Sequence, residues 1–299
     1  GSAPVSTPDA LHRAMHSTTA LQSGLVRPAA PRRRRRKGLA GPQPFARRRP
    51  YTVFADLYDM AMGEAALPAL IDAFDTSRRK FGIATGSIAD IGCGTGRLLQ
   101  YLGRFGGQLT GVDISEAMLR RARRRTDGQD VRFLRQDIRD LALGEPVDCI
   151  TCTFDTINYL RGEEDLPRLF AACARNLKPG GYLLLDFIPS GSHEGQRLKA
   201  KQFFRFRTIE TEWRTEFEPD GTGSTVTILM QKTRPDGTVR RAYEVHRQKW
   251  HAPQDVGRVL KEAGYEIVDE RPAEPDGGND WVHYVARYTG YRGSLLGDD

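Results

Sequence analysis

The stretch Ile88-Ala-Asp-Ile-Gly-Cys-Gly-Thr-Gly96 decides the fold of this 299-residue chain. It predicts a short apolar strand, followed by a glycine-rich turn that opens a helix at about Thr95. The three glycines, at alternate positions, let the backbone bend tightly and approach a ligand closely. A dinucleotide-binding turn would need a further glycine where Arg97 stands, and a P-loop would need Gly-Lys-Ser/Thr. The turn therefore suits a nucleoside ligand that has no pyrophosphate.

Strand and helix patterns alternate in the residues after this turn. Apolar segments predict strands at 109–112, 131–134, 148–154 and 182–187. Helical periodicity predicts helices at 95–105, 115–126 and 165–177. Alternation at this spacing predicts an α/β protein with a doubly wound, Rossmann-like parallel sheet.

Four acids fall at or just beyond the carboxyl ends of predicted strands: Asp90, Asp113, Asp137 and Asp155. Ligands of doubly wound sheets bind at this edge of the sheet. Asp113 can accept hydrogen bonds from both hydroxyls of a ribose. Asp137 can accept the exocyclic amine of adenine, and Ile138 can flank the ring. Four acids in register predict a nucleoside site.

Charge and pattern divide the chain into four parts. Residues 1–50 contain eleven Lys and Arg and one acid, so they carry +10 of the net charge of +7, and the rest carries −3. This segment has no hydrophobic periodicity and is predicted to be a disordered basic tail. Residues 51–203 form the predicted core. Residues 204–251 are predicted to be an inserted antiparallel lid of three strands, with hairpin turns at Asp220-Gly221 and Asp236-Gly237. A helix and strands in 252–299 complete the core sheet.

Composition limits the function classes. With 39% hydrophobic residues and a mean hydropathy of −0.52, the chain has no run long enough for a membrane span. The four cysteines lie within predicted elements, which favours a reducing, cytoplasmic setting and predicts no metal site. The run Arg32 to Lys37 could bind nucleic acid, but a solvated charge run is the favoured interpretation.

A series of motifs resembles that of the class I S-adenosylmethionine (SAM) dependent methyltransferases. The motifs are Asp90-Ile-Gly-Cys-Gly-Thr-Gly96, Val112-Asp113-Ile-Ser, Gln136-Asp137-Ile, Thr151-Cys-Thr-Phe-Asp155 and Leu177-Lys-Pro-Gly-Gly181. The resemblance implies SAM as cofactor, with the glycine loop at its methionine part, Asp113 at its ribose and Asp137 at its adenine. The implied cofactor-binding residues are Tyr58, Asp90, Gly92, Cys93, Gly94, Gly96, Asp113, Ile114, Met118, Asp137, Ile138, Thr153 and Phe154.

Within that family the chain looks most like the small-molecule branch, notably the N,N-dimethyltransferases of amino sugars. Tyr51 with the following Asp56-Leu-Tyr-Asp-Met60 is similar to their N-terminal lid. Tyr159 stands where those enzymes carry a histidine implicated in catalysis, and a tyrosine with a pKa near ~10 is a poor base at neutral pH. We expect methyl transfer to an amine or hydroxyl of a small molecule, with Tyr51, Tyr159 and His246 as catalytic residues.

The sequence shows no obvious carboxylate–histidine pair near these residues, so it predicts catalysis mainly by alignment. The inserted strands are also a candidate surface for a homodimer.

Two other functions stay open at this point. A nucleic-acid (RNA) methyltransferase recruited by the arginine-rich tail is one. Base amino-methyltransferases carry Asp/Asn-Pro-Pro-Tyr after the fourth strand, whereas this chain has Phe154-Asp-Thr-Ile-Asn158. Cytosine-C5 enzymes need a Pro-Cys nucleophile, whereas Cys152 follows Thr151. The motifs therefore make nucleic acid an improbable partner. The other alternative is a non-catalytic SAM-binding partner protein.

Overall fold

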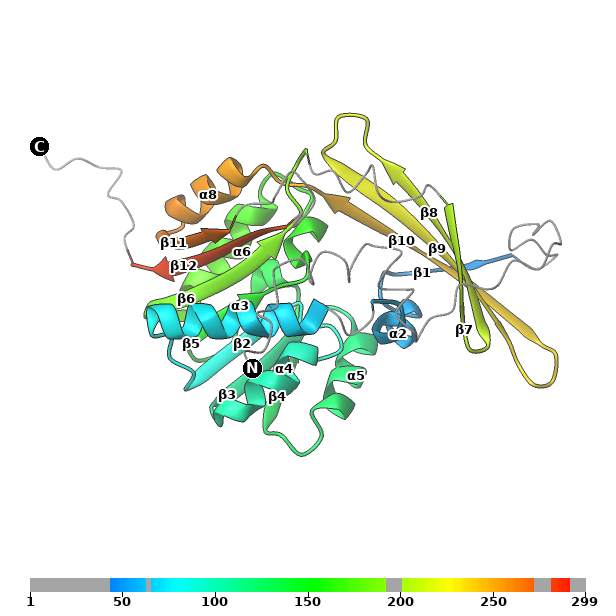
Figure 1. Cartoon of the computed structure of the whole chain (residues 1–299), viewed down its shortest axis with the longest axis horizontal. Helices are drawn as coiled ribbons and strands as arrows, with labels where there is room; N and C mark the ends of the chain where they lie inside the picture. Colours follow the sequence, from blue (N-terminus) through cyan, green and yellow to red (C-terminus); the bar gives the residue numbers. More distant parts are fainter. Residues whose placement is uncertain (1–43, 63–65, 192–200, 272–280, 291–299) are drawn as a thin grey trace, which may run out of the picture.

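The computed structural model describes residues 44–62, 66–191, 201–271 and 281–290, which form two β-sheets (Figure 1). The core sheet has seven strands in the order β11-β12-β6-β5-β2-β3-β4. Their bounds are β2 (Ser87–Ile91), β3 (Gln108–Asp113), β4 (Val131–Arg135), β5 (Val147–Cys152), β6 (Leu177–Phe187), β11 (Tyr265–Arg271) and β12 (Val282–Tyr288). The predicted basic tail lies, except for its last residues, outside the described residues.

Strands β2 to β6 are parallel, which confirms the predicted doubly wound sheet. From β2 the chain proceeds outward to β3 and β4, and then returns to the other side of β2 with β5 and β6. This reversal opens a crevice beyond the carboxyl ends of β2, β3 and β5, where ligands of such sheets bind. β12 runs antiparallel to β6 and closes the sheet together with β11.

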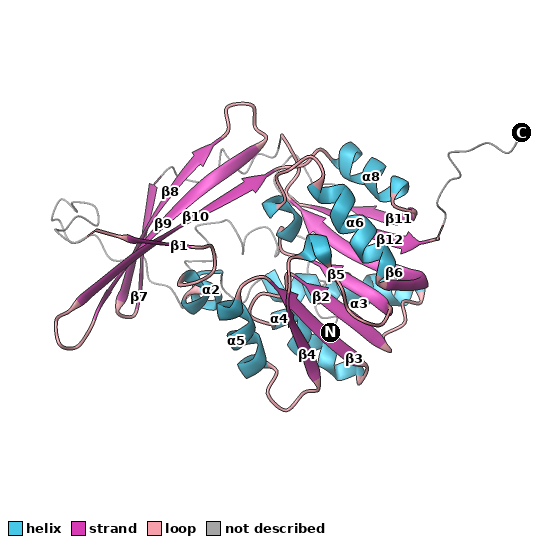
Figure 2. Ribbon diagram, turned by 180° about the vertical axis from the view of Figure 1, so that it is seen from behind, coloured by secondary structure: helices cyan, strands magenta, loops and turns pink. Residues whose placement is uncertain are grey.

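Helices cover both faces of the core sheet (Figure 2). One face carries α3 (Ala66–Phe81), α4 (Arg97–Leu102), η2 (Gly103–Phe105) and α5 (Glu116–Arg125). The other face carries α6 (Asp165–Arg175) and α8 (Pro253–Glu262). Ser115 caps α5, its hydroxyl accepting the N–H of Met118. No helix in the described ranges is long and apolar enough to cross a membrane.

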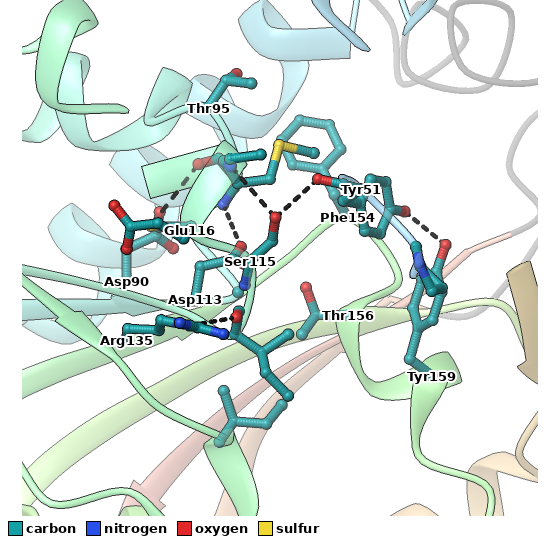
Figure 3. Close-up of a pocket in the computed structure, with 18 of the residues that line it drawn as sticks. Tyr51, Asp90, Thr95, Asp113, Ser115, Glu116, Arg135, Phe154, Thr156 and Tyr159 are labelled. Atoms are coloured by element: carbon teal, nitrogen blue, oxygen red, sulfur yellow. Dashed lines mark hydrogen bonds between the residues drawn. The ribbon is translucent and has the colours of Figure 1, made fainter. Parts of the chain in front are cut away.

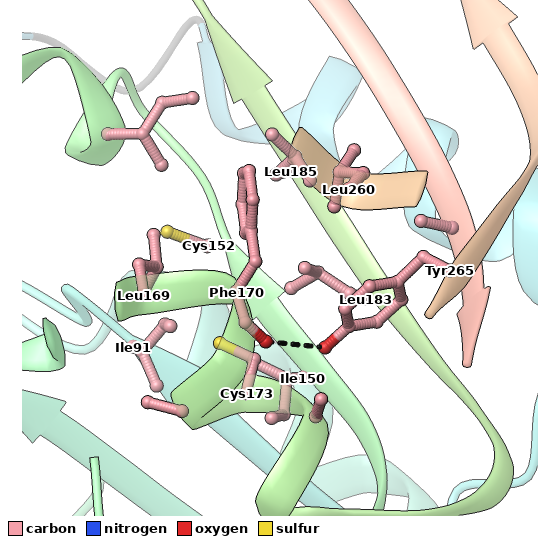
Figure 4. Packing of buried hydrophobic residues seen from close by; sticks show 14 of the residues in the cluster. Ile91, Ile150, Cys152, Leu169, Phe170, Cys173, Leu183, Leu185, Leu260 and Tyr265 are labelled. Carbon is pink, nitrogen blue, oxygen red and sulfur yellow. Dashed lines mark hydrogen bonds between the residues drawn. The ribbon is translucent and has the colours of Figure 1, made fainter. Parts of the chain in front are cut away.

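The larger core cluster lies between the sheet and α6 and α8 (Figure 4). Phe170 of α6 is fully buried against strand side chains such as Ile150 and Leu183. Truncation of such a phenylalanine to alanine typically costs about 3–5 kcal/mol of stability. All four cysteines are buried free thiols, and burial raises their pKa values, so their thiols are unreactive.

The second sheet has five strands, not the three predicted, and four of the five follow β6 in the chain. Its order is β1-β10-β9-β8-β7, with bounds β1 (Ala46–Arg48), β7 (Lys201–Phe206), β8 (Ile209–Phe217), β9 (Gly223–Thr233) and β10 (Val239–Lys249). One of the additional strands is β7, which pairs with β8 in a hairpin that turns at Arg207, whose φ is 52°.

The fifth strand, β1, comes from the segment that we had assigned to the tail. It pairs parallel with β10, so the folded part begins before the predicted boundary at residue 50. β1 is exposed and has no apolar pattern, because only its backbone takes part in the sheet. Hydrophobic periodicity could not reveal it.

A short lid segment lies between the two sheets and contains η1 (Phe54–Asp56) and α2 (Tyr58–Met62). Phe54 and Leu57 are buried against Phe206, Ile228 and Met230 of the inserted sheet. Two further turns complete the crevice, η3 (Ile138–Asp140) after β4 and η4 (Thr156–Tyr159) after β5.

Candidate functional site

A cavity of about 590 Å³ opens at the carboxyl ends of β2 and β3 (Figure 3). This volume is in the range of small-molecule and cofactor sites. The predicted site residues that line it are Tyr51, Tyr58, Asp90, Gly92, Cys93, Gly94, Asp113, Ile114, Met118, Asp137, Ile138, Thr153, Phe154 and Tyr159. Two predicted site residues, Gly96 and His246, do not line it. Sequence reasoning missed several further lining residues, among them Ser115, Thr156 and Arg135.

Each of the three glycines of the turn is required for a different structural reason. Gly92 has φ 71°, and a Cβ there would lie 2.5 Å from the side chain of Thr156. Gly94 has φ 52° and open space where a Cβ would stand, so its backbone is exposed to a ligand in the cavity. Gly96 has φ 77°, and a Cβ there would lie 3.0 Å from Ala122 of α5. Gly96 therefore serves helix packing and does not face the ligand.

Two buried carboxylates form one wall of the cavity. Asp113 accepts the N–H of Ser115 on one oxygen (2.8 Å) and the N–H of Gly94 on the other (2.9 Å). Burial raises its pKa although these backbone donors oppose the shift. Asp90 accepts the Thr151 hydroxyl at 2.7 Å. Burial, opposed by that hydrogen bond and reinforced by the charge of Asp113, raises the pKa of Asp90 to about 7.

The other two acids have different surroundings. Asp137 lines the cavity, and the Arg139 guanidinium donates to both of its oxygens (2.9 and 2.6 Å). This pairing lowers the pKa of Asp137 against the effect of burial. Asp155 does not line the cavity, contrary to its predicted place at the nucleoside site. Its carboxylate accepts the side-chain amide of Gln248 on β10, so it joins η4 to the inserted sheet.

The cavity fits SAM on features of the structure itself. Ile114 follows Asp113 and is 63% exposed, the one large hydrophobic side chain so exposed among the described residues. A flat apolar ring such as adenine would cover it. Carboxylates along the wall suit hydroxyl, amine and ammonium donors, and the open backbone at Gly94 suits a group that must approach closely.

Ion pairs and hydrogen bonds hold the lid segment over the cavity. Ser115 donates its hydroxyl to the carbonyl of Tyr51 at 2.7 Å. Asp59 accepts the hydroxyl of Thr95 (2.7 Å) and the guanidinium of Arg125 (2.5 Å). Thr95 belongs to the glycine turn, so these contacts connect the lid to the turn directly.

Two of the four non-glycine residues with positive φ in the described ranges line this cavity: Tyr51 and Phe154. Such backbone strain costs about 1–3 kcal/mol per residue and tends to occur at functional sites. At Tyr51 the strained backbone lies between β1 and η1, and the ring packs 5.7 Å from that of Tyr159. Both hydroxyls lie at the same end of the cavity, 2.5 Å apart.

A row of polar groups leads from these hydroxyls into the inserted sheet. The Tyr159 hydroxyl lies 3.1 Å from Nδ1 of His246, and Nε2 of His246 lies 3.2 Å from Oε2 of Glu244. The expectation that no carboxylate–histidine pair adjoins the site is therefore wrong. Sequence reasoning missed Glu244, although the pattern Glu-x-His places both side chains on one face of a strand.

Comparisons with known proteins agree with this geometry. Residues 88–181 match the protein family described as "Methyltransferase domain". A protein of Geobacillus sp. (strain WCH70) that is named as a methyltransferase is 28% identical over 249 residues, which cover 79% of this chain and 99% of that protein. The dTDP-3-amino-3,4,6-trideoxy-alpha-D-glucopyranose N,N-dimethyltransferase of Streptomyces venezuelae is 31% identical over 135 residues, 44% of this chain and 56% of the relative.

The fold also matches solved structures. An S-adenosylmethionine-dependent methyltransferase from Clostridium acetobutylicum ATCC 824 superposes with a TM-score of 0.68 at 23% identity, over 79% of this chain and 97% of that one. The matched domain and the relatives identify the class: this chain is a methyltransferase.

Proposed function

We propose that this protein transfers a methyl group from SAM to an amine or hydroxyl of a small molecule, as in secondary metabolism. The observation that carries this proposal is the arrangement of the cavity: the carboxylates of Asp90 and Asp113 form one wall, and the hydroxyls of Tyr51 and Tyr159 lie together at one end. The name of the Streptomyces venezuelae relative supports an amine as the acceptor.

We assign the cofactor contacts by position. Asp113 would accept the ribose hydroxyls, and Asp137 and Ile138 would hold the adenine across from the exposed Ile114. The backbone of the turn at Gly94 and the carboxylate of Asp90 would face the methionine part. SAM supplies a methyl group on a positively charged sulfur, which leaves as a neutral thioether.

The chain's own part in the reaction is to align the acceptor, exclude water and accept a proton. Tyr51 and Tyr159 line the end of the cavity and are the residues that would touch the acceptor. The lid contacts through Ser115 and Asp59 close the cavity, which excludes water and keeps the reacting groups in line. His246, which we expected to orient the acceptor, lies behind the two tyrosines and can act only through them.

The test is a transfer assay with SAM labelled in its methyl group. The candidate acceptors are dTDP-3-amino-3,4,6-trideoxy-α-D-glucose, other primary and secondary amines, and phenols. Label in an amine or phenol product supports the proposal. Label found only in RNA or DNA, with turnover that falls steeply as salt rises, would refute it in favour of a nucleic-acid substrate. SAM binding without transfer to any acceptor would support the non-catalytic alternative.

We also propose that the protein acts in the cytoplasm, without a nucleic-acid partner, and as a homodimer through the inserted sheet. The residues after β5, Phe154 to Asn158, lack the motif that base methyltransferases need, and this supports the absence of a nucleic-acid partner. The inserted sheet stands beside the core and ends in the edge strand β7, which supports a pairing surface there. Sedimentation of the whole chain at micromolar concentration tests the dimer, and a monomer would refute it.

A further inference from the structure

Four polar side chains from three distant segments form one continuous row. Tyr51 belongs to the lid, Tyr159 to η4, and His246 and Glu244 to β10. The hydroxyls of the tyrosines are 2.5 Å apart, Tyr159 lies 3.1 Å from Nδ1 of His246, and Nε2 lies 3.2 Å from Glu244. Only the tyrosines reach the cavity. His246 is 5% exposed and Glu244 is fully buried. The row therefore joins the cavity to a buried carboxylate.

Glu244 is held as an ionised carboxylate by the lid backbone. Its Oε1 accepts the N–H groups of Thr52, Val53 and Phe54 at 3.1, 2.6 and 3.0 Å. Its Oε2 accepts the N–H of Tyr51 at 2.8 Å. Burial opposes ionisation, but the hydrogen bonds from His246 and the backbone outweigh it and lower the pKa of Glu244. All these partners donate to the carboxylate, so none of them requires it to carry a proton.

An ionised Glu244 decides the tautomer of His246. Since the carboxylate can only accept, Nε2 of the imidazole carries the proton that it donates to Oε2. Nδ1 then holds a lone pair, and it faces the hydroxyl of Tyr159. Tyr159 can donate to Nδ1 and at the same time accept a proton from a group in the cavity. The hydrogen bonds of the row thus all have the same sense, with each donor on the side of the cavity up to His246 and the last donated by His246 to Glu244.

Among the residues that the structure describes, the two rings packed on the imidazole do not compete with Tyr159 and Glu244 for its nitrogens. The rings of Tyr51 and Phe54 pack edge-on against His246, with centroids 4.8 and 5.9 Å away. Burial, and then the charge of Asp155, raises the pKa of Tyr159, although the hydrogen bond with Tyr51 opposes the shift. Tyr58 and Glu244 act on Tyr159 in the same direction as burial. Tyr159 therefore does not hold a negative charge, and it can pass a proton only by releasing its own to His246.

We infer that His246, positioned by Glu244, is the proton acceptor of the methyl transfer and receives the proton through the hydroxyl of Tyr159. This rests on the proposed function. For an amine, the acceptor nitrogen bonds to the methyl carbon as the methyl–sulfur bond breaks, and that electron pair stays on sulfur. The nitrogen then gives one N–H proton to the Tyr159 oxygen, and the Tyr159 proton moves to Nδ1 of His246. The negative charge of Glu244 balances the positive charge of the imidazolium. The proton on His246 returns to water when product leaves.

The kinetic test uses His246→Gln, Tyr159→Phe and the double variant, with the acceptor that the labelled-SAM assay identifies. Each single variant should lower kcat at neutral pH by about 100-fold to 10,000-fold, the range of general base catalysis. Their SAM dissociation constants should stay within about threefold. Because the two residues act in one chain, the double variant should be no slower than the slower single variant. For His246→Gln, kcat should rise steeply with pH, since hydroxide or a deprotonated acceptor replaces the lost base.

A matched control separates proton transfer from packing. His283→Gln replaces a half-buried histidine on β12 of the core sheet, which lies outside the row and the cavity. It should leave kcat and its pH profile unchanged. Losses that multiply in the double variant, or a pH profile for His246→Gln that parallels the wild type, would overturn the inference. Glu244 variants are unsuitable as a first test, because this carboxylate also holds four lid N–H groups.

A measurement without any acceptor keeps this inference separate from the proposed function. Long-range ¹H–¹⁵N correlation spectra of the whole protein labelled at histidine report which ring nitrogen of His246 carries the proton. A proton on Nε2, with a shift of Nδ1 in Tyr159→Phe, supports the row as described. A proton on Nδ1 would overturn it, whatever the transfer assay shows. A failed transfer assay with the expected tautomer would instead refute the proposed function.

Discussion

Replacement of Asp113 by alanine should weaken SAM binding by about one to three decades in Kd. In the structure each carboxylate oxygen of Asp113 accepts one backbone N–H, from Ser115 and from Gly94. Each oxygen has a second lone pair, and Asp113 lines the cavity. Two ribose hydroxyls can therefore bind without displacing the backbone donors.

The magnitude follows from those two contacts. A hydrogen bond to a charged group contributes roughly 1.5–3 kcal/mol, and water in the emptied site recovers part of it. A net loss of about 1.4–4 kcal/mol corresponds to about 10-fold to 1,000-fold in Kd. Alanine also leaves the N–H groups of Ser115 and Gly94 without their acceptor, which adds to the loss at the turn.

Isothermal titration calorimetry with SAM and with its demethylated product measures the effect. Asp148→Ala is the matched control, because Asp148 also accepts a backbone N–H, from Ser87 at 2.8 Å. It lies near the start of β5, at the opposite end of the sheet and outside the cavity. The control should bind SAM as the wild type does. If Asp113→Ala, still folded by circular dichroism, bound SAM within twofold of the wild type, the assignment of Asp113 to the ribose would be wrong.

Three further predictions concern pH, the lid and the adenine contact. Burial raises the pKa of Asp186 to about 8, so the folded state keeps a proton that the unfolded state has lost, and stability falls as pH rises through that value. Urea unfolding from pH 6.5 to 8.5 should show that the free energy of unfolding falls by about 1–2 kcal/mol, and Asp186→Asn should largely remove this fall. If the free energy of unfolding of the variant changed with pH as in the wild type, the assignment to Asp186 would be wrong. Asp59→Asn weakens the contacts of the lid to Thr95 and Arg125, so stopped-flow should find SAM dissociation about threefold to tenfold faster, and an unaltered rate would mean that the lid does not retain the ligand. Ile114→Ser should raise the Kd of SAM about fivefold to tenfold through the lost apolar contact with adenine, without a change in unfolding free energy beyond ~0.5 kcal/mol; equal affinity would place the adenine elsewhere.

Much of the core and of the cofactor cavity could be predicted from the chain alone. A buried parallel strand, a glycine turn and an amphipathic helix are each encoded by residues that are neighbours in sequence. Once the strands are known to be parallel, their carboxyl ends must lie at one edge of the sheet, which is why Asp90, Asp113 and Asp137 were placed at the cavity correctly. The same argument misplaced Asp155, because its side chain turns to Gln248 of another sheet.

The positions of Gly96 and β1 show two ways in which local reasoning is incomplete. All three glycines of the turn look alike in sequence. Gly96, however, has to lack a side chain because Ala122 of the neighbouring helix lies against it. β1 has no apolar alternation, because it contributes backbone pairing alone to β10. Contacts that depend on a packed neighbour, or on backbone hydrogen bonds alone, leave no periodic signal in the side chains.

The sequence by itself determined the α/β class, the glycine turn and the acids of the cofactor wall, since each follows from a local pattern. The candidate tyrosines came from the resemblance to amino-sugar methyltransferases. The tertiary structure decided which residues stand together at the reacting end of the cavity. Glu244 and the N–H of Tyr51 that it accepts are separated by 193 positions in the chain. Tyr159 and His246 are 87 apart. Their meeting depends on how the inserted sheet packs on the lid, and such long-range packing is set by the fit of whole surfaces and not by the residues adjacent in the chain.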